Sequence, residues 1–227
     1  MRTSINLFFL GLVTLFLAAC GNAPAGEKVE SGEAMDAAET PAAAASVVYA
    51  VNTAESQVNW VGGKLVGNDQ HTGFLKLSNG SLSLEDGNLV AGKFAIDMNS
   101  LTNTDMGAGD GKEKLEGHLK SGDFFDVGNH PEGSFEIVAV EAVSGQEGIT
   151  HNITGNLTLK GIAKSITIPA SVKISENELV ASTPDFNINR TEWGVKYGSG
   201  LLGIAQDKII KDEVGLQINL KAAPQAN

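Results

Sequence analysis

The sequence has little cysteine, little positive charge and few aromatic residues. Cys20 is the only cysteine among 227 residues, so the chain can form no disulfide within itself. Lysine and arginine number 16 against 27 aspartates and glutamates, which gives a net charge of −11. An acidic chain without basic clusters is not expected to bind nucleic acid or to dock on anionic lipid by electrostatic attraction. Apolar side chains would therefore have to hold any lipid.

Motifs of the common catalytic and metal sites are also missing. The four histidines show no spacing typical of a zinc site, and HExxH does not occur. GxSxG, the nucleophile elbow of many hydrolases, is absent, and the glycine-rich stretch 107–111 follows no parallel strand that leads into a helix. These absences predict a protein that is not an enzyme, with no catalytic residue, no metal site and no cofactor.

The N-terminus contains an apolar run that is typical of an export signal. Arg2 is followed by INLFFLGLVTLFLAAC, which is short for a membrane span of about 20 apolar residues and has small residues before Cys20. The run resembles the bacterial lipoprotein signal, in which the cysteine is acylated and becomes the new N-terminus. We expect a signal peptide over residues 1–19 and a lipidated Cys20, whose acyl chains, palmitate among them, hold the protein on a membrane. An uncleaved anchor and an ordinary signal peptide that leaves a free thiol are the alternatives.

The residue after Cys20 indicates where the lipoprotein would be located in the cell envelope. In such lipoproteins an aspartate there tends to retain the protein at the inner membrane, whereas this chain has Gly21. The expected location is the cell envelope, lipid-anchored to the outer membrane and facing the periplasm. Residues 20–45 are expected to form the lipidated cysteine and a disordered tether, acidic and rich in alanine, that spans roughly 25–30 Å. An alanine-rich helix at the end of the tether is the alternative.

Beyond the tether, apolar and polar residues alternate with a period of two. In NITGNLTLKG, Ile153, Leu157 and Leu159 share one face, and the threonines and asparagine share the other. This alternation indicates strands with one solvated face. SITIPASVKI, KFAIDM and LQINLK repeat the pattern. Less regular segments that are compatible with strands cover 47–51, 57–65, 73–84, 134–143 and 178–188.

Few residues remain for helices, since only 110–121 and 190–200 have the length. Without a helical layer to cover its apolar face, the sheet must fold onto itself as a sandwich or a closed barrel. Long hairpins in sequence order favour an all-β domain over 46–223, an antiparallel up-and-down β-barrel of about eight strands. Residues 224–227 would form a C-terminal tail.

Three separated motifs carry a family resemblance. HLKSGDFFDVGNHPEGSFE, ITGNLTLKGIAKSITIP and FNINRTEWGVKYGS occur in this order after YAVNTAESQVNWVGGKLVGNDQHTGFLKL, so the resemblance covers 48–222. In these motifs the chain resembles the YceI-like polyisoprenoid-binding family. The resemblance implies a periplasmic, lipocalin-like barrel, elongated and apolar inside, with one or two short helices at the barrel end. One departure is Lys64, where many members carry a histidine, so that side chain's contacts are not transferred.

The resemblance also implies the ligand. The lumen would bind an isoprenoid-type amphiphilic lipid, a quinone or a prenyl lipid, without catalysis, for sequestration or transport in the periplasm. We expect the ligand contacts to be Trp60, Phe74, Phe94, Ile96, Phe124, Phe125, Phe135, Leu157, Ile166, Phe186, Arg190 and Trp193. The alternative is a structural lipoprotein whose barrel is filled by its own side chains and whose surface binds another envelope protein. An enzyme acting on such lipids is a third hypothesis, which the missing acid–base groups disfavour.

The adjacent Phe124 and Phe125 cannot serve one core stripe, because neighbouring side chains diverge in both strands and helices. We expect them to plug one end of the barrel, one ring in the lumen and one beneath the short helix, with direct ligand contact as the alternative. Asp123 and Asp126 would accept hydrogen bonds from backbone N–H groups of this turn.

Arg190 and Trp193 lie close together in the motif NRTEWG. At the mouth of the barrel, the planar guanidinium of Arg190 would stack on or pair with the head group of a ligand. The alternative is a buried arginine that pairs with a carboxylate of the protein itself, such as Asp97 or Asp123.

Overall fold

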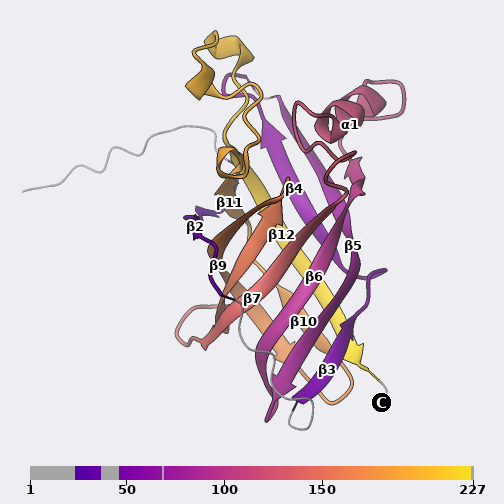
Figure 1. Ribbon diagram of the computed structural model, residues 1–227, viewed down its shortest axis with the longest axis vertical. Helices are drawn as coiled ribbons and strands as arrows, with labels where there is room; N and C mark the ends of the chain where they lie inside the picture. Colours follow the sequence, from indigo (N-terminus) through magenta and orange to yellow (C-terminus); the bar gives the residue numbers. More distant parts are fainter. Residues whose placement is uncertain (1–23, 37–45, 68, 226–227) are drawn as a thin grey trace, which may run out of the picture.

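The computed structural model describes residues 24–36, 46–67 and 69–225, which form one elongated antiparallel barrel (Figure 1). Its wall is a ring of eight strand positions, so the expected lipocalin-like, all-β barrel is confirmed. The strands of the ring are β3 (Ser46–Val51), β4 (Gln57–Gly63), β5 (Gln70–Glu85), β6 (Asn88–Asn103), β7 (Glu132–Ala142), β8 (His151–Leu159), β9 (Ile162–Ile174), β10 (Leu179–Ser182), β11 (Phe186–Asn189) and β12 (Glu213–Pro224).

Two of these positions are occupied by a broken strand. β3 and β4 both lie between β5 and β12, and β10 and β11 both pair with β12. The strands β5 to β10 pair in sequence order up to the break, and β12 closes the ring against β4. β9 pairs with β10 only through residues 171–174. The first half of β9 therefore has no partner from the ring on that side.

The period-two pattern of the sequence becomes the two faces of the wall. In β9 the inward residues Ile166, Ile168, Ala170 and Val172 are buried, and the residues between them are exposed or half-buried. The hairpin from β8 to β9 turns on Lys160 and Gly161, both at positive φ. Two consecutive residues at positive φ are typical of two-residue hairpin turns, whose twist matches that of the paired strands.

The short helical segments gather at one end of the barrel, which we call the helix end (Figure 1). α1 (Lys112–Lys120) confirms the helix expected at 110–121. The region 190–200 instead contains only 3-10 turns, because glycines at positive φ interrupt it at Gly194 and Gly198. The turns are η1 (Arg190–Trp193), η2 (Gly200–Leu202) and η3 (Gln206–Lys208).

Side chains fill the opposite half of the barrel. The Tyr49 hydroxyl donates to the Ser175 carbonyl at 2.8 Å and lies within a dense apolar cluster. β12 continues to Pro224, which pairs with Tyr49, so the barrel extends past the expected boundary at 223. Buried members of this half include Leu82, Leu84, Leu89, Leu179 and Ala222.

Residues 24–36 run along the outside of the wall, and we call them the N-terminal strap. Its β1 (Glu27–Lys28) pairs in parallel with β11, and its β2 (Gly32–Glu33) pairs antiparallel with β9 at 164–165. The strap thus joins β11 to the half of β9 that the ring leaves without a partner. Free strand edges offer backbone donors and acceptors, and the strap satisfies them.

Side-chain hydrogen bonds fix both ends of the strap. Asn187 Nδ2 donates to the carbonyl of Pro24 at 3.0 Å, and Asn156 exchanges two hydrogen bonds with the backbone of Met35 at 2.9 and 2.7 Å. This part of the expected disordered tether is therefore ordered, because edges elsewhere in the chain bind it. The signal peptide and Cys20 lie outside the described residues.

Replacing Asn156 with alanine should loosen the strap, because both hydrogen bonds to Met35 are lost. At about 1 kcal/mol each, their loss should speed amide hydrogen exchange at 32–35 by about tenfold or more. Asn152→Ala on the same strand is the matched control, because its side chain forms no hydrogen bond with the residues described. Equal exchange in the two variants would show that Asn156 does not hold the strap.

Candidate ligand-binding cavity

A cavity of about 240 Å³ occupies the half of the barrel nearest to α1. Every strand position of the ring contributes to its wall, and Leu115 and Leu119 of α1 lie across its end. An apolar cavity of about 150 Å³ is enough to hold a benzene molecule. The space is therefore sufficient for an apolar ligand.

Eleven of the twelve side chains expected to contact a ligand line this cavity. Phe74 does not: its neighbours Gly73 and Leu75 are buried, Leu75 lines the cavity, and strand alternation turns Phe74 to the outer face. Phe74 is therefore not a lumen residue. The side chains that do line the cavity are Trp60, Phe94, Ile96, Phe124, Phe125, Phe135, Leu157, Ile166, Phe186, Arg190 and Trp193.

Two stacked phenylalanines form the floor of the cavity. The ring centroids of Phe94 and Phe135 lie 5.5 Å apart, with an angle of 26° between the ring planes. Both rings also border a second space of about 50 Å³ in the filled half, so they separate the two. A β-carbon at Gly155 would collide with the Phe135 ring, so this ring position requires glycine there.

Phe124 and Phe125 cover part of the helix end beside α1, and both line the cavity. Phe124 is 5% exposed, and its ring centroid lies 5.0 Å from that of His118 and 5.2 Å from that of Tyr197. The Phe125 N–H donates to the Leu119 carbonyl at 3.1 Å, which ties it to the end of α1. The pair forms a plug whose inner surface belongs to the cavity.

The carboxylates beside this pair bind side chains, whereas backbone N–H groups were expected. Asp123 Oδ2 lies 3.0 Å from His118 Nε2, and Asp126 accepts two hydrogen bonds from the Asn129 amide at 3.1 and 3.0 Å. Lys160 Nζ, in the β8–β9 hairpin, donates to two backbone carbonyls of the turn at 3.3 and 2.9 Å. The hairpin thus holds the plug in place.

The buried Arg190 forms an internal ion pair with the half-buried Asp212. Its guanidinium donates to three backbone carbonyls at 2.7–3.1 Å and to Asp212 Oδ1 at 3.3 Å, and it lies 6.0 Å from the Phe124 ring centroid. Burial lowers the pKa of Arg190, and the charge of Asp212 opposes that shift. The carboxylate partner is Asp212, and neither Asp97 nor Asp123 takes that role. Arg190 therefore fixes the loop at the helix end.

Both tryptophans line the cavity, but only one indole N–H has a partner. Trp193 is fully buried, and its Nε1 donates to the Leu157 carbonyl at 2.9 Å. Trp60 is 8% exposed, and its buried Nε1 has no hydrogen-bond partner among the residues described. An unpaired buried donor costs about 1–3 kcal/mol.

The cavity reaches the surface at a polar opening, which we call the mouth. Lys64 and Asp69 line the cavity there and are themselves exposed. They form an ion pair of 2.5 Å, and the Lys64 ammonium lowers the pKa of Asp69. The carboxylate of Asp69 is therefore already neutralised by a cation of the mouth.

Lys211 is a mouth residue that the sequence analysis missed. It lines the cavity and is 9% exposed, and within the described ranges its Nζ forms no hydrogen bond or ion pair. Its backbone is fixed on both sides, because its N–H donates to Gly63 and its carbonyl accepts from Arg190. The only signal in the sequence is a lysine directly after two isoleucines, which does not reveal that the side chain faces a cavity.

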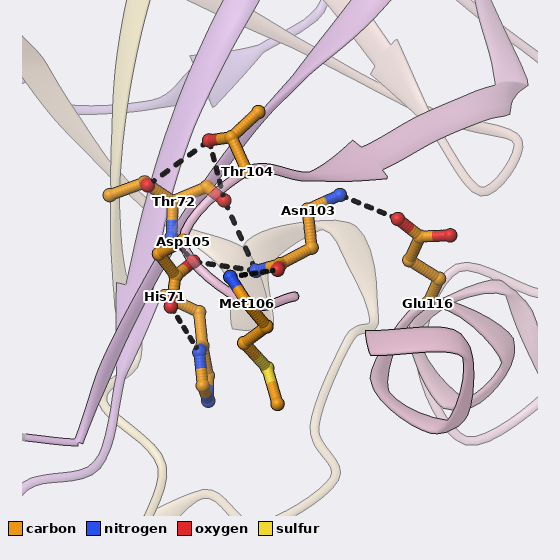
Figure 2. A network of polar contacts seen from close by, with 7 residues as sticks. All are labelled: His71, Thr72, Asn103, Thr104, Asp105, Met106 and Glu116. Carbon is orange, nitrogen blue, oxygen red and sulfur yellow. Dashed lines mark hydrogen bonds and ion pairs between the residues drawn. The ribbon is translucent and has the colours of Figure 1, made fainter. Parts of the chain in front are cut away.

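A polar network holds one side of the mouth against α1 (Figure 2). His71, which lines the cavity, has Nδ1 2.9 Å from Asp105 Oδ2, and Asp105 Oδ1 accepts from the Thr72 N–H at 2.7 Å. Desolvation opposes the ionisation of Asp105, but hydrogen bonds from Thr72, His71 and Asn103 outweigh it and lower its pKa. The N–H of the buried Asn103 donates to Glu116 of α1 at 2.8 Å.

The cavity has apolar walls and a closed floor, and two residues that line it, Trp60 and Lys211, carry donors with no partner among the residues described. In the described part of the chain, no three histidine, cysteine, aspartate or glutamate side chains group as metal ligands would. No helix in that part is long and apolar enough to cross a membrane.

The fold and this cavity define the class of lipocalin-like barrels with an apolar internal cavity. The model of the YceI-like domain family matches residues 49–222, and the chain belongs to that family. A UPF0312 protein of Pseudomonas paraeruginosa is 32% identical over 146 residues, 64% of this chain and 63% of that protein. A UPF0312 protein of Pseudomonas aeruginosa matches with the same identity and coverage. The chain thus spans about 63% of the length of these relatives.

Solved structures share the fold. BcnA of Burkholderia cenocepacia superposes with a TM-score of 0.59 at 24% identity, over 76% of this chain and 99% of that one. A polyisoprenoid binding domain from Saccharophagus degradans, implicated in plant cell wall breakdown, gives a TM-score of 0.57 at 15% identity, over 79% and 99%. At these identities the likeness shows the fold alone.

Arg190→Met should destabilise the barrel by about 3–5 kcal/mol, because it leaves Asp212 and three carbonyls without their buried partner. Urea unfolding followed by tryptophan fluorescence measures the change. Lys196→Met, an exposed change on the same loop, should have little effect. A loss below about 1 kcal/mol for Arg190→Met would mean that solvent replaces the buried ion pair.

Proposed function

We propose that the barrel binds an isoprenoid-type amphiphilic lipid, a quinone or a prenyl lipid, in its cavity without catalysing a reaction. The observation that carries the proposal is the apolar cavity itself, which is closed by Phe94 and Phe135 at one end and reaches solvent at the mouth. The Saccharophagus degradans structure, a polyisoprenoid binding domain with the same fold, supports the same class of ligand.

In this proposal the tail of the ligand lies on the floor and its head group at the mouth. Each isoprene unit removes about five carbons from water, an upper bound of roughly 3–4 kcal/mol before ordering costs. The tail therefore supplies most of the affinity. At the mouth, the Lys211 ammonium lacks a counter-ion among the described residues, so it favours a head group with negative charge or acceptor oxygens.

We place this binding in the cell envelope. Acylation of Cys20 would anchor the protein on the outer membrane, facing the periplasm, and the barrel would sequester the lipid or carry it across the aqueous space. The support is the signal-like run that ends at Cys20, followed by Gly21.

A structural role with an envelope protein partner remains the second candidate. The observation that favours it is the filled half of the barrel, where the buried side chains leave only about 50 Å³. The two candidates differ in whether the larger cavity binds a ligand.

Affinity for geraniol, farnesol and geranylgeraniol should rise with tail length until the tail reaches the floor. Phe94→Trp raises that floor and should lower affinity for the longest alcohol that the native chain accepts, because the larger ring occupies tail space. Calorimetric titration of the delipidated Cys20→Ser chain measures this. Lys93→Trp, on the outer face of the same strand, is the control. Binding that is undetectable, or independent of length, would favour the structural role.

Lys211→Met should remove the preference for a charged head group. The native chain should bind farnesyl phosphate about tenfold more tightly than farnesol, since a charge-assisted hydrogen bond contributes about 1.5–3 kcal/mol. In Lys211→Met the two affinities should become equal, while farnesol binding changes little. Lys208→Met, an exposed change on η3, should keep the preference. A preference that survives in Lys211→Met would exclude Lys211 as the head-group contact.

A further inference from the structure

Exposed apolar side chains gather beside the mouth. Leu65 and Val66, in the loop after β4, are 45% and 53% exposed. Leu201 and Leu202 of η2 are 75% and 58% exposed. We call these four residues the apolar rim. The segment that carries η2 and η3 projects beyond the ring of strands at the helix end (Figure 1).

Backbone hydrogen bonds join the two loops of the rim. The Leu65 N–H donates to the Ile209 carbonyl at 2.8 Å, and Lys64 pairs with Ile210 as an isolated bridge. Lys64, Ile210 and Lys211 also line the cavity. The rim and the mouth therefore belong to one connected surface.

The N-terminal strap limits how far this surface can lie from a membrane anchor. Pro24 is buried on the outer face of the wall, close to Gly215, which pairs with Val61 in the half of the barrel that holds the cavity. Cys20 lies four residues before Pro24, so a fully extended chain separates them by at most about 14 Å. A disordered tether of the whole 20–45 segment would span roughly 25–30 Å and impose no orientation.

We propose that the mouth end docks on the surface of a lipid bilayer, with the apolar rim inserted among the lipids, so that the ligand passes between bilayer and cavity without crossing water. This inference rests on the proposed lipid ligand and on acylation of Cys20. The short reach from Cys20 to Pro24 makes the bilayer the occupant of the rim, because the anchor holds that half of the barrel beside it.

The physical basis of docking is apolar and not electrostatic. The chain carries a net charge of −11, which disfavours attraction to anionic lipid, whereas leucine side chains leave water on insertion. Docking through the rim should therefore depend little on salt concentration. A dock that relied on basic residues would weaken steeply as salt is added.

The first experiment tests the position of the rim. The chain acylated at Cys20 has no other cysteine, so Leu202→Cys introduces the only free thiol for an environment-sensitive fluorophore. In vesicles of phosphatidylethanolamine and phosphatidylglycerol, the emission at 202 should shift to the blue, and salt should not reverse the shift. Val47→Cys, exposed on β3 at the far end, is the control and should stay in water. Equal, water-like emission at both positions would overturn the proposal, and a rim that binds a protein partner would give that outcome.

The second experiment tests lipid transfer and separates the two proposals. Leu201→Ser with Leu202→Ser should slow transfer of farnesol from vesicles to the acylated chain by about tenfold, with affinity in detergent-free solution unchanged. Val47→Ser with Val180→Ser is the matched control. A native chain that binds no farnesol in solution would refute the proposed function itself. Normal affinity with an unchanged transfer rate in the rim variant would refute only the docking.

A third experiment tests the anchor by membrane sedimentation. Cys20→Ser should release the chain from membrane pellets into the soluble fraction, because the rim alone is too small to hold it. A Cys20→Ser chain that still sediments with membranes after a high-salt wash would show that acylation is not the anchor, and the reach argument would fail with it.

Discussion

The structure depends on the burial of an apolar sheet face that has no helical layer to cover it. Such a face is stable only inside a closed ring of backbone hydrogen bonds, and closure also removes the free edges through which sheets aggregate. Two of the ring positions here are broken strands. Where β10 gives way to β11, the ring leaves half of β9 without a partner, and the N-terminal strap pairs with that edge. The strap is therefore a consequence of how the ring closes.

Closure also decides what happens inside. A ring of about eight strands is wide enough either to fill with side chains or to hold one slim ligand. This barrel is filled by side chains in one half and encloses a cavity in the other. The stacked Phe94 and Phe135 mark the boundary between the packed core and the cavity. At the helix end, hydrogen bonds supplement the packing. Arg190, Lys160 and the network around Asp105 hold the plug, the loop and α1 against a cavity that gives them no apolar support.

The barrel relates the proposed ligand binding to the place of the mouth near the membrane anchor. In the proposed function, the aromatic floor limits the length of the tail, and Lys211 at the mouth contacts the head group. Because the strap brings the chain back to the cavity half of the wall, the distance from Cys20 to the mouth is set by few residues. A lipid carrier that docks by its mouth spares its ligand the cost of exposure to water, which grows with every isoprene unit.

The sequence by itself determined the strand pattern, the short helix, the barrel and most of the lumen, because period-two alternation encodes which face of a strand is buried. The sequence-based prediction was wrong for Phe74. Its neighbour Leu75 faces the cavity, and alternation along the strand turns Phe74 to the outer face. Only the tertiary structure decided that Arg190 pairs with Asp212, that Lys211 lines the cavity with no partner in the described part of the chain, and that residues 24–36 are ordered. Each of these depends on contacts between segments far apart in the chain, and local pattern carries no information about which distant group will be within hydrogen-bond reach.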